Sequence, residues 1–171
     1  MNLLSLALIL LAGCSPTDLK KDRNDRDSKD VRDFIFTEAD LRKSQENRIG
    51  HWIYPPDIIL CSDAPIKRQR LEAAISWWEN IGYSFGTLQS DVRGGDCIKK
   101  SPVGKIIVTL ITQDLWDHDH YGKTITTYHE PTGNIYYSKV YLFYSNTPTR
   151  VVRHELGHAL GIGHYNRTGH M

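Results

Sequence analysis

The chain has little net charge and no long apolar run. Its 171 residues carry a formal net charge of +1 at pH 7, so the composition does not predict a nucleic-acid partner or a strongly charged ligand. The longest apolar run, from Leu3 to Leu11 with Ser5 as its one interruption, covers nine residues, which is too short for a permanent membrane span. The length predicts one folded domain, which we place at residues 50–171.

Cysteine is scarce, with three in the chain, and the first follows the apolar run. Leu11-Ala12-Gly13-Cys14 resembles a bacterial lipobox, which implies that residues 1–14 are a lipoprotein signal peptide and that cleavage leaves Cys14 as a lipidated N-terminus. The implied location is the outer membrane, periplasm or surface of a bacterium, with a lipid anchor as the contact with the membrane. The alternative is an ordinary signal peptide with an incidental cysteine, because no Lys or Arg precedes the apolar run.

The other two cysteines, Cys61 and Cys97, form an even pair in a chain that we expect to be exported, and this predicts a disulfide. They lie 36 residues apart in the sequence. Closing a loop of that length stabilises a fold by roughly 4 kcal/mol in the chain-entropy model. The alternative is two free, buried thiols, since the sequence does not show whether their Cα atoms approach each other.

Large apolar side chains are nearly absent between residues 15 and 33, which contain six Asp and six basic residues. Such a segment cannot bury enough surface to offset its ordering entropy. We interpret residues 15–49 as a charged, flexible tether. Its last part, with Phe34, Ile35 and Phe36, either packs on the domain or covers its cleft.

The domain contains one region with the periodicity of a helix that packs on a core. Residues 64–81 have apolar side chains on one helical face, at Leu71, Ala74, Ile75 and Trp78. Asp63 is predicted to cap the N-terminus of this helix, and Gly82 is predicted to end it.

Strand patterns lie on both sides of this helix. A short apolar run at 58–60 precedes it, and the β-branched run at 105–112 has the composition of a central strand. Two further strand candidates, 123–128 and 135–144, are separated by a turn. A second helix, from about 148 to 160, follows them, and the whole order predicts an α+β fold.

The most specific pattern is a histidine motif on the second helix. Residues four apart share a helical face, so His154 and His158 can hold one metal ion, with Glu155 beside them. Gly161 can adopt a positive φ and end the helix, after which His164 supplies a third nitrogen. Three neutral ligands leave one tetrahedral position open, which is the arrangement of a catalytic zinc ion. The alternative is a surface helix with incidental histidines.

The run HELGHALGIGH at 154–164 resembles the zinc-binding signature of the metzincin metalloproteases, most closely the matrixin-like branch, and Met171 resembles the methionine of their Met-turn. The resemblance implies a metzincin-like N-terminal subdomain: a twisted mixed sheet of about four to five strands, a backing helix and an active-site helix. It also implies that an edge strand, here 123–128, pairs with substrate. The C-terminal subdomain of that family is expected to be essentially absent, because the chain ends at Met171.

The resemblance implies a zinc-dependent endopeptidase that hydrolyses peptide bonds of extracytoplasmic proteins or peptides. Zinc would activate a water molecule, and Glu155 would act as the general base. One alternative is a non-catalytic zinc-containing lipoprotein that binds a partner protein, and another is an enzyme whose site a partner completes. A third is hydrolysis of a cell-wall peptide crosslink. The intact Glu155 favours an enzyme, and the sequence does not predict the oligomeric state.

A second group of metal-ligating residue types is Asp117-His118-Asp119-His120. A comparable loop binds a structural metal in matrixins, and the resemblance therefore offers these residues as a second metal site. The alternative is a solvated loop, which we take as the expectation because short His/Asp clusters carry little specificity.

Overall fold

A computed structural model gives the fold, and it describes residues 6–10, 48–98, 102–111, 121–145 and 147–163. Cys14 and the tether up to residue 47 lie outside the described residues. The described elements in chain order are β1 (Leu6–Leu10), β2 (Asp57–Cys61), α3 (Arg68–Glu79), β3 (Leu88–Val92), the 3-10 helix η2 (Gly95–Cys97), β4 (Lys105–Leu110), β5 (Gly122–His129), β6 (Asn134–Leu142) and α4 (Thr149–Ala159).

The strands form one mixed sheet in the order β1-β5-β6-β4-β2-β3. The neighbours from β6 to β3 are parallel, whereas β5 is antiparallel to β6 and β1 is antiparallel to β5. Helix α3 makes the crossover that the parallel strands β2 and β3 require. The five strands described between residues 57 and 142, with two helices, confirm the α+β class, and Leu6–Leu10 adds a sixth strand beside β5.

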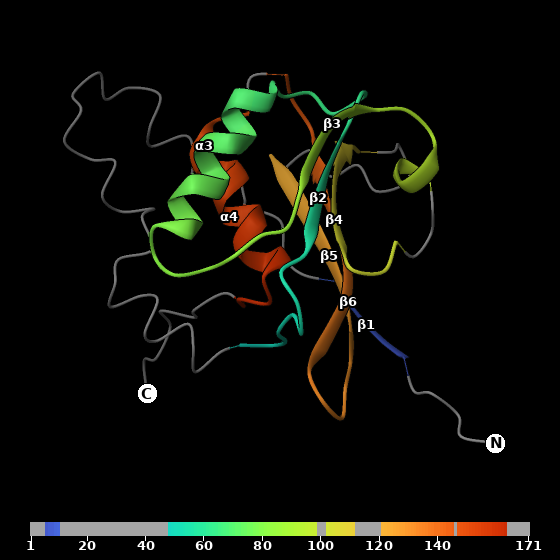
Figure 1. The fold of residues 1–171 in the computed structure, drawn as a ribbon. Helices are drawn as coiled ribbons and strands as arrows, with labels where there is room; N and C mark the ends of the chain where they lie inside the picture. Colours follow the sequence, from blue (N-terminus) through green and yellow to red (C-terminus); the bar gives the residue numbers. More distant parts are fainter. Residues whose placement is uncertain (1–5, 11–47, 99–101, 112–120, 146, 164–171) are drawn as a thin grey trace, which may run out of the picture.

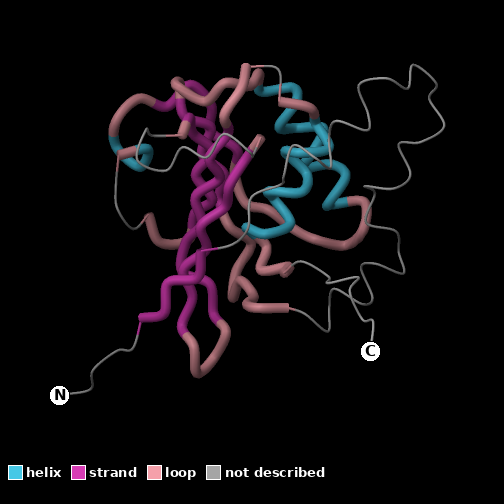
Figure 2. Tube along the Cα trace, turned by 180° about the vertical axis from the view of Figure 1, so that it is seen from behind, coloured by secondary structure: helices cyan, strands magenta, loops and turns pink. Residues whose placement is uncertain are grey.

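Both helices lie on the same face of the sheet (Figures 1 and 2). Helix α3 packs against α4, and α4 packs against β5 and β6. Because side chains alternate between the two faces of a strand, Ile58 and Leu60 of β2 join the main core beneath the helices, whereas Ile59 and Cys61 join a smaller cluster on the other face. The sheet is therefore covered by apolar side chains on both sides, as expected of parallel strands.

Trp78 of α3 connects the main core to α4. It is the largest side chain among the fully buried ones of the described residues, and its ring lies edge-on to Tyr83 with the centroids 5.0 Å apart. Its indole N–H donates a hydrogen bond to the carbonyl of Arg153, at 2.8 Å. Because Arg153 directly precedes His154, this bond fixes the position of the histidine motif relative to α3.

The sequence prediction of α3 is correct at its end and wrong at its start. Gly82, with a φ of 96°, ends the helix as expected. The helix begins at Arg68, its N-cap residue is Lys67, and Asp63 does not cap it. The Asp63 carboxylate instead accepts a hydrogen bond from the Thr109 hydroxyl of β4, at 2.9 Å, which holds the turn after β2 against the sheet.

The structure also contains two strands that the sequence analysis does not predict: β1, which lies in the segment interpreted as a signal peptide, and β3. Strand β3, Leu-Gln-Ser-Asp-Val, alternates between half-buried and exposed residues at the outer edge of the sheet. Three polar residues in five give it little strand propensity. Its place in the sheet is set by pairing with β2, which the local sequence does not show.

The disulfide between Cys61 and Cys97 is present, with the two Cα atoms 5.9 Å apart, which confirms that prediction. It connects the end of β2 to η2, and both cysteines belong to the small cluster with Ile59, Ile107 and Val92. The disulfide therefore lies on the face of the sheet opposite the two helices.

Replacing both cysteines by alanine should lower the free energy of unfolding by about 2–4 kcal/mol, because the unfolded chain regains the entropy of the closed loop. Urea denaturation of the oxidised protein and of the double variant measures the difference. The control is the wild-type protein reduced with a thiol, whose free energy of unfolding should approach that of the double variant. An unchanged denaturation midpoint would show that the loop is already restricted in the unfolded chain.

Candidate metal centre

The two described histidines of the motif face each other on α4. Their Nε2 atoms are 2.9 Å apart and their rings are edge-on, with centroids 4.5 Å apart. His158 is 1 % exposed and His154 is half-buried. A zinc–nitrogen bond is about 2.0–2.1 Å long, so one ion can contact both nitrogens.

The protonation of His158 suits a metal ligand. Its Nδ1 atom lies 2.7 Å from the carbonyl oxygen of Ile162. A carbonyl can only accept a hydrogen bond, so Nδ1 carries the proton and Nε2 of the neutral ring keeps its lone pair. A second partner of this kind is what fixes the orientation of a metal-binding imidazole.

The Glu155 side chain of α4 packs against strand β5. Its side chain is fully buried, and its Oε2 atom accepts a hydrogen bond of 2.6 Å from the Thr124 hydroxyl. Gly122 faces the same side chain, and a Cβ atom at Gly122 would lie 2.8 Å from Cγ of Glu155. A larger residue than glycine at 122 would therefore displace the Glu155 side chain.

Three buried hydroxyl groups join the sheet to α4, and we call Thr124, Thr126 and Ser138 the hydroxyl seam. All three residues are 0 % exposed. The Thr126 and Ser138 hydroxyls are 2.8 Å apart, the carbonyl oxygen of His158 is 3.1 Å from Thr126, and that of Ala159 is 3.3 Å from Ser138. Because each hydroxyl has one proton, the shorter distances favour donation from Ser138 to Thr126 and from Thr126 to the His158 carbonyl. The seam fixes the carbonyl side of the last turns of α4 against β5 and β6.

The sequence pattern of β5 could have revealed part of the seam. Thr124 and Thr126 are two apart and must share a face, as the alternation predicts. The alternation does not show that this threonine face is the buried one, because a polar face is usually assigned to solvent. Gly122 and Ser138 carry no signal of their own in a single sequence.

The end of α4 is held by residues 48–52. Gly161 has a φ of 89°, as the motif predicts, and its carbonyl accepts a hydrogen bond of 2.9 Å from the amide of Ile49. The Trp52 indole N–H donates to the carbonyl of Ala159, also at 2.9 Å. His51 exchanges backbone hydrogen bonds with the β5–β6 turn, at Gly133 and Ile135. This segment therefore ties the helix end to the hairpin of the sheet.

Several predicted site residues lie outside the described residues: His164, Met171 and the cluster Asp117, His118, Asp119 and His120. Within residues 48–98, 102–111, 121–145 and 147–163, no three His, Cys, Asp or Glu side chains are grouped to hold a metal ion. The described part of the site supplies two imidazole nitrogens and the Glu155 carboxylate. These groups fit the nitrogen ligands and the general base that the motif assigns to a zinc site.

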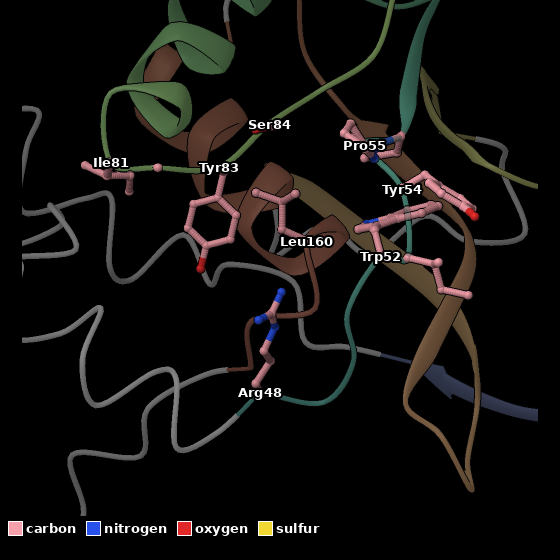
Figure 3. Close-up of a pocket in the computed structure, with 11 residues that line it drawn as sticks. Arg48, Trp52, Tyr54, Pro55, Ile81, Tyr83, Ser84 and Leu160 are labelled. Carbon is pink, nitrogen blue, oxygen red and sulfur yellow. The ribbon is translucent and has the colours of Figure 1, made fainter.

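A cavity of about 350 Å³ lies near the end of α4, between residues 48–56 and the loop after α3, and Leu160 forms part of its wall (Figure 3). Trp52 and Tyr83 supply aromatic walls, and Arg48 and Tyr83 point toward one another (Figure 3). Burial raises the pKa of the Tyr83 hydroxyl above its usual value, against the opposing effect of the Arg48 charge. Leu160 is two residues, or roughly 200° of helical turn, from His158, which places the cavity across α4 from the histidine pair.

Replacing Gly161 by alanine should destabilise the protein by more than about 2 kcal/mol, because the backbone conformation would become strained and the new Cβ would clash with the backbone of Gly50. The positive φ disfavours any L side chain, and the Cβ atom would lie 2.2 Å from the carbonyl oxygen of Gly50. Thermal and urea denaturation measure the loss.

Gly82→Ala is the matched control, because Gly82 also has a positive φ but a Cβ atom added there would have no neighbouring atom within 4 Å. It should cost roughly 1–2 kcal/mol from backbone strain alone. Equal losses in the two variants would show that the contact between Gly161 and Gly50 carries no part of the stability.

Comparison of the chain with protein-family models, curated proteins and solved structures found no match. Any function of the chain is therefore a proposal, which rests on the histidine motif and on the contacts of its residues.

Proposed function

We propose that this protein is a zinc-dependent endopeptidase of the metzincin type. The observation that carries the proposal is a pair of histidines whose Nε2 atoms face one another at 2.9 Å, on a helix that also carries the fully buried Glu155. A structural zinc site needs ligands but no general base, and a buried carboxylate is costly unless it is hydrogen-bonded and has a use. The arrangement therefore favours hydrolysis over a purely structural metal.

In this proposal His154, His158 and His164 hold the zinc ion through neutral imidazole nitrogens. When bound, zinc lowers the pKa of a water molecule and polarises the substrate carbonyl. Glu155 takes the proton from the attacking water and later delivers it to the leaving amine nitrogen. Oε2 accepts a hydrogen bond from the Thr124 hydroxyl, and in this proposal Oε1 carries out the proton transfer.

The arrangement of the sheet supports the proposal. A mixed sheet backed by one helix, with the motif helix beneath it, is what the metzincin resemblance implies for the N-terminal subdomain. The outer edge of β5 already pairs with an extended antiparallel segment, from Leu6 opposite His129 to Leu10 opposite Ile125 (Figure 1). An edge that accepts one strand by backbone hydrogen bonds is suited to an extended peptide substrate.

We also propose that the protein is exported and anchored by lipid at Cys14, at the outer membrane or surface of a bacterium. The Cys61–Cys97 disulfide supports export, because disulfides persist in oxidising compartments. In the parts of the chain that the structure describes, neither helix has the length and apolar character to cross a bilayer. Mass spectrometry of the N-terminal peptide should find a lipid on Cys14, and an unmodified terminus elsewhere would contradict the anchor.

The purified, zinc-loaded protein should hydrolyse an unfolded protein, and a zinc chelator should stop the reaction. Glu155→Gln should lower kcat roughly 10²- to 10⁴-fold, because the general base is lost, while zinc remains bound. His158→Ala should lose zinc as well as turnover. Cleavage assays and zinc determination on the same samples separate the two roles.

Loss of zinc from Glu155→Gln would contradict this division of roles. A folded, zinc-loaded wild type that cleaves no peptide bond would contradict the peptidase itself. That result would favour a lipoprotein that binds a partner protein, or a site that a partner completes.

A further inference from the structure

We propose that Thr124 is a positioning residue for the general base: its hydroxyl holds one oxygen of Glu155, so that the other oxygen faces the reacting water. The inference rests on the proposed peptidase function and adds a residue that the histidine motif does not contain. It comes from contacts between β5 and α4, which are 31 residues apart in sequence at this point.

The distances show which acceptor the Thr124 hydroxyl serves. A hydroxyl has a single proton, and two acceptors of Glu155 lie near it: Oε2 at 2.6 Å and the backbone carbonyl at 3.1 Å. Hydrogen bonds from a hydroxyl to an ionised carboxylate are typically about 2.5–2.7 Å long and stronger than neutral ones. The proton therefore goes to Oε2, so the Thr124 hydroxyl donates to the side chain of Glu155 and not to its backbone carbonyl.

Gly122 leaves the space that the Glu155 side chain occupies. A Cβ atom at this position would lie 2.8 Å from Cγ and 3.1 Å from Oε1 of Glu155. Gly122 and Thr124 are two apart on β5 and share the face that packs against α4. The space left by Gly122 and the hydroxyl of Thr124 thus act on the same side chain from one face of β5.

Strand β5 contacts the proposed general base, and it also carries the edge proposed to pair with an extended substrate. The outer edge of β5 pairs with a strand up to Ile125, the residue next to Thr124. A substrate on this edge and the Glu155 carboxylate on the helix-facing side are thus positioned by the same strand. Thr124 acts on the reaction through Glu155 and makes no contact with substrate in this scheme.

The competing interpretation is that Thr124 stabilises the fold and does nothing else. Thr126 is the matched control, because it lies on the same strand and face, is equally buried, and donates to α4 through the carbonyl of His158 instead of a carboxylate. Thr124→Val and Thr126→Val each remove one buried hydroxyl at nearly constant volume. Thr124→Ser keeps the hydroxyl.

For the zinc-loaded protein, Thr124→Val should lower kcat roughly 10- to 100-fold, since small misplacements of a reacting group have costs of this size. KM and zinc content should stay at wild-type values. Thr124→Ser should restore most of kcat, and Thr126→Val should lower kcat far less than Thr124→Val does. Gly122→Ala should also lower kcat, because it displaces the carboxylate while the Thr124 hydroxyl is intact. If Thr124→Val does not fold, Thr124→Ala replaces it in the comparison with Thr126.

Crystal structures of the two valine variants give a readout that does not depend on activity. The Glu155 carboxylate should move in Thr124→Val and stay in place in Thr126→Val. If the wild type has no peptidase activity, the proposed function fails while this comparison still tests the positioning role. An unmoved carboxylate in Thr124→Val, or equal losses of kcat in both valine variants, would overturn the inference.

Discussion

The contact between the hydroxyl seam and α4 is the constraint on which the site depends. A helix packed on a sheet by apolar side chains alone can slide or rotate by small amounts at little cost. Here the Thr126 hydroxyl, which Ser138 contacts, bonds to the carbonyl of His158 in the last turns of the helix, and Trp78 bonds to the carbonyl of Arg153 before the motif. Directional bonds of this kind, buried away from water, are costly to break, so they fix where the histidines point.

The disulfide and the histidine motif lie on opposite sides of the sheet. The main core and the histidine motif lie on the helix side of the sheet, and the disulfide with its small apolar cluster lies on the other side. Residues 48–52 close the remaining gap by joining the helix end to the β5–β6 hairpin. The polar site is thereby held by groups that have no part in the proposed chemistry.

The sequence predicts the elements better than their contacts. The run at 105–112 and the apolar face of α3 are found because burial leaves a strong local pattern. Asp63 is misassigned because a cap and a tertiary acceptor look alike in sequence, and Thr109, its partner, is 46 residues away. At the site, His154, Glu155 and His158 follow from one helical repeat, whereas Gly122 and Thr124 matter only because the fold brings β5 against α4. His164 and Met171 remain predictions.

Strand β5 has contacts on three sides. Its inner edge pairs with β6, its helix-facing side contacts Glu155, and its outer edge pairs with β1, a segment that cleavage before Cys14 would remove. Substitutions in this strand should therefore be tolerated best on the opposite face, where Lys123 and Ile125 are only half-buried. Gly122 and Thr124 have no such freedom, because a larger side chain at 122 meets Cγ of Glu155 and the loss of the hydroxyl at 124 removes the donor to its carboxylate.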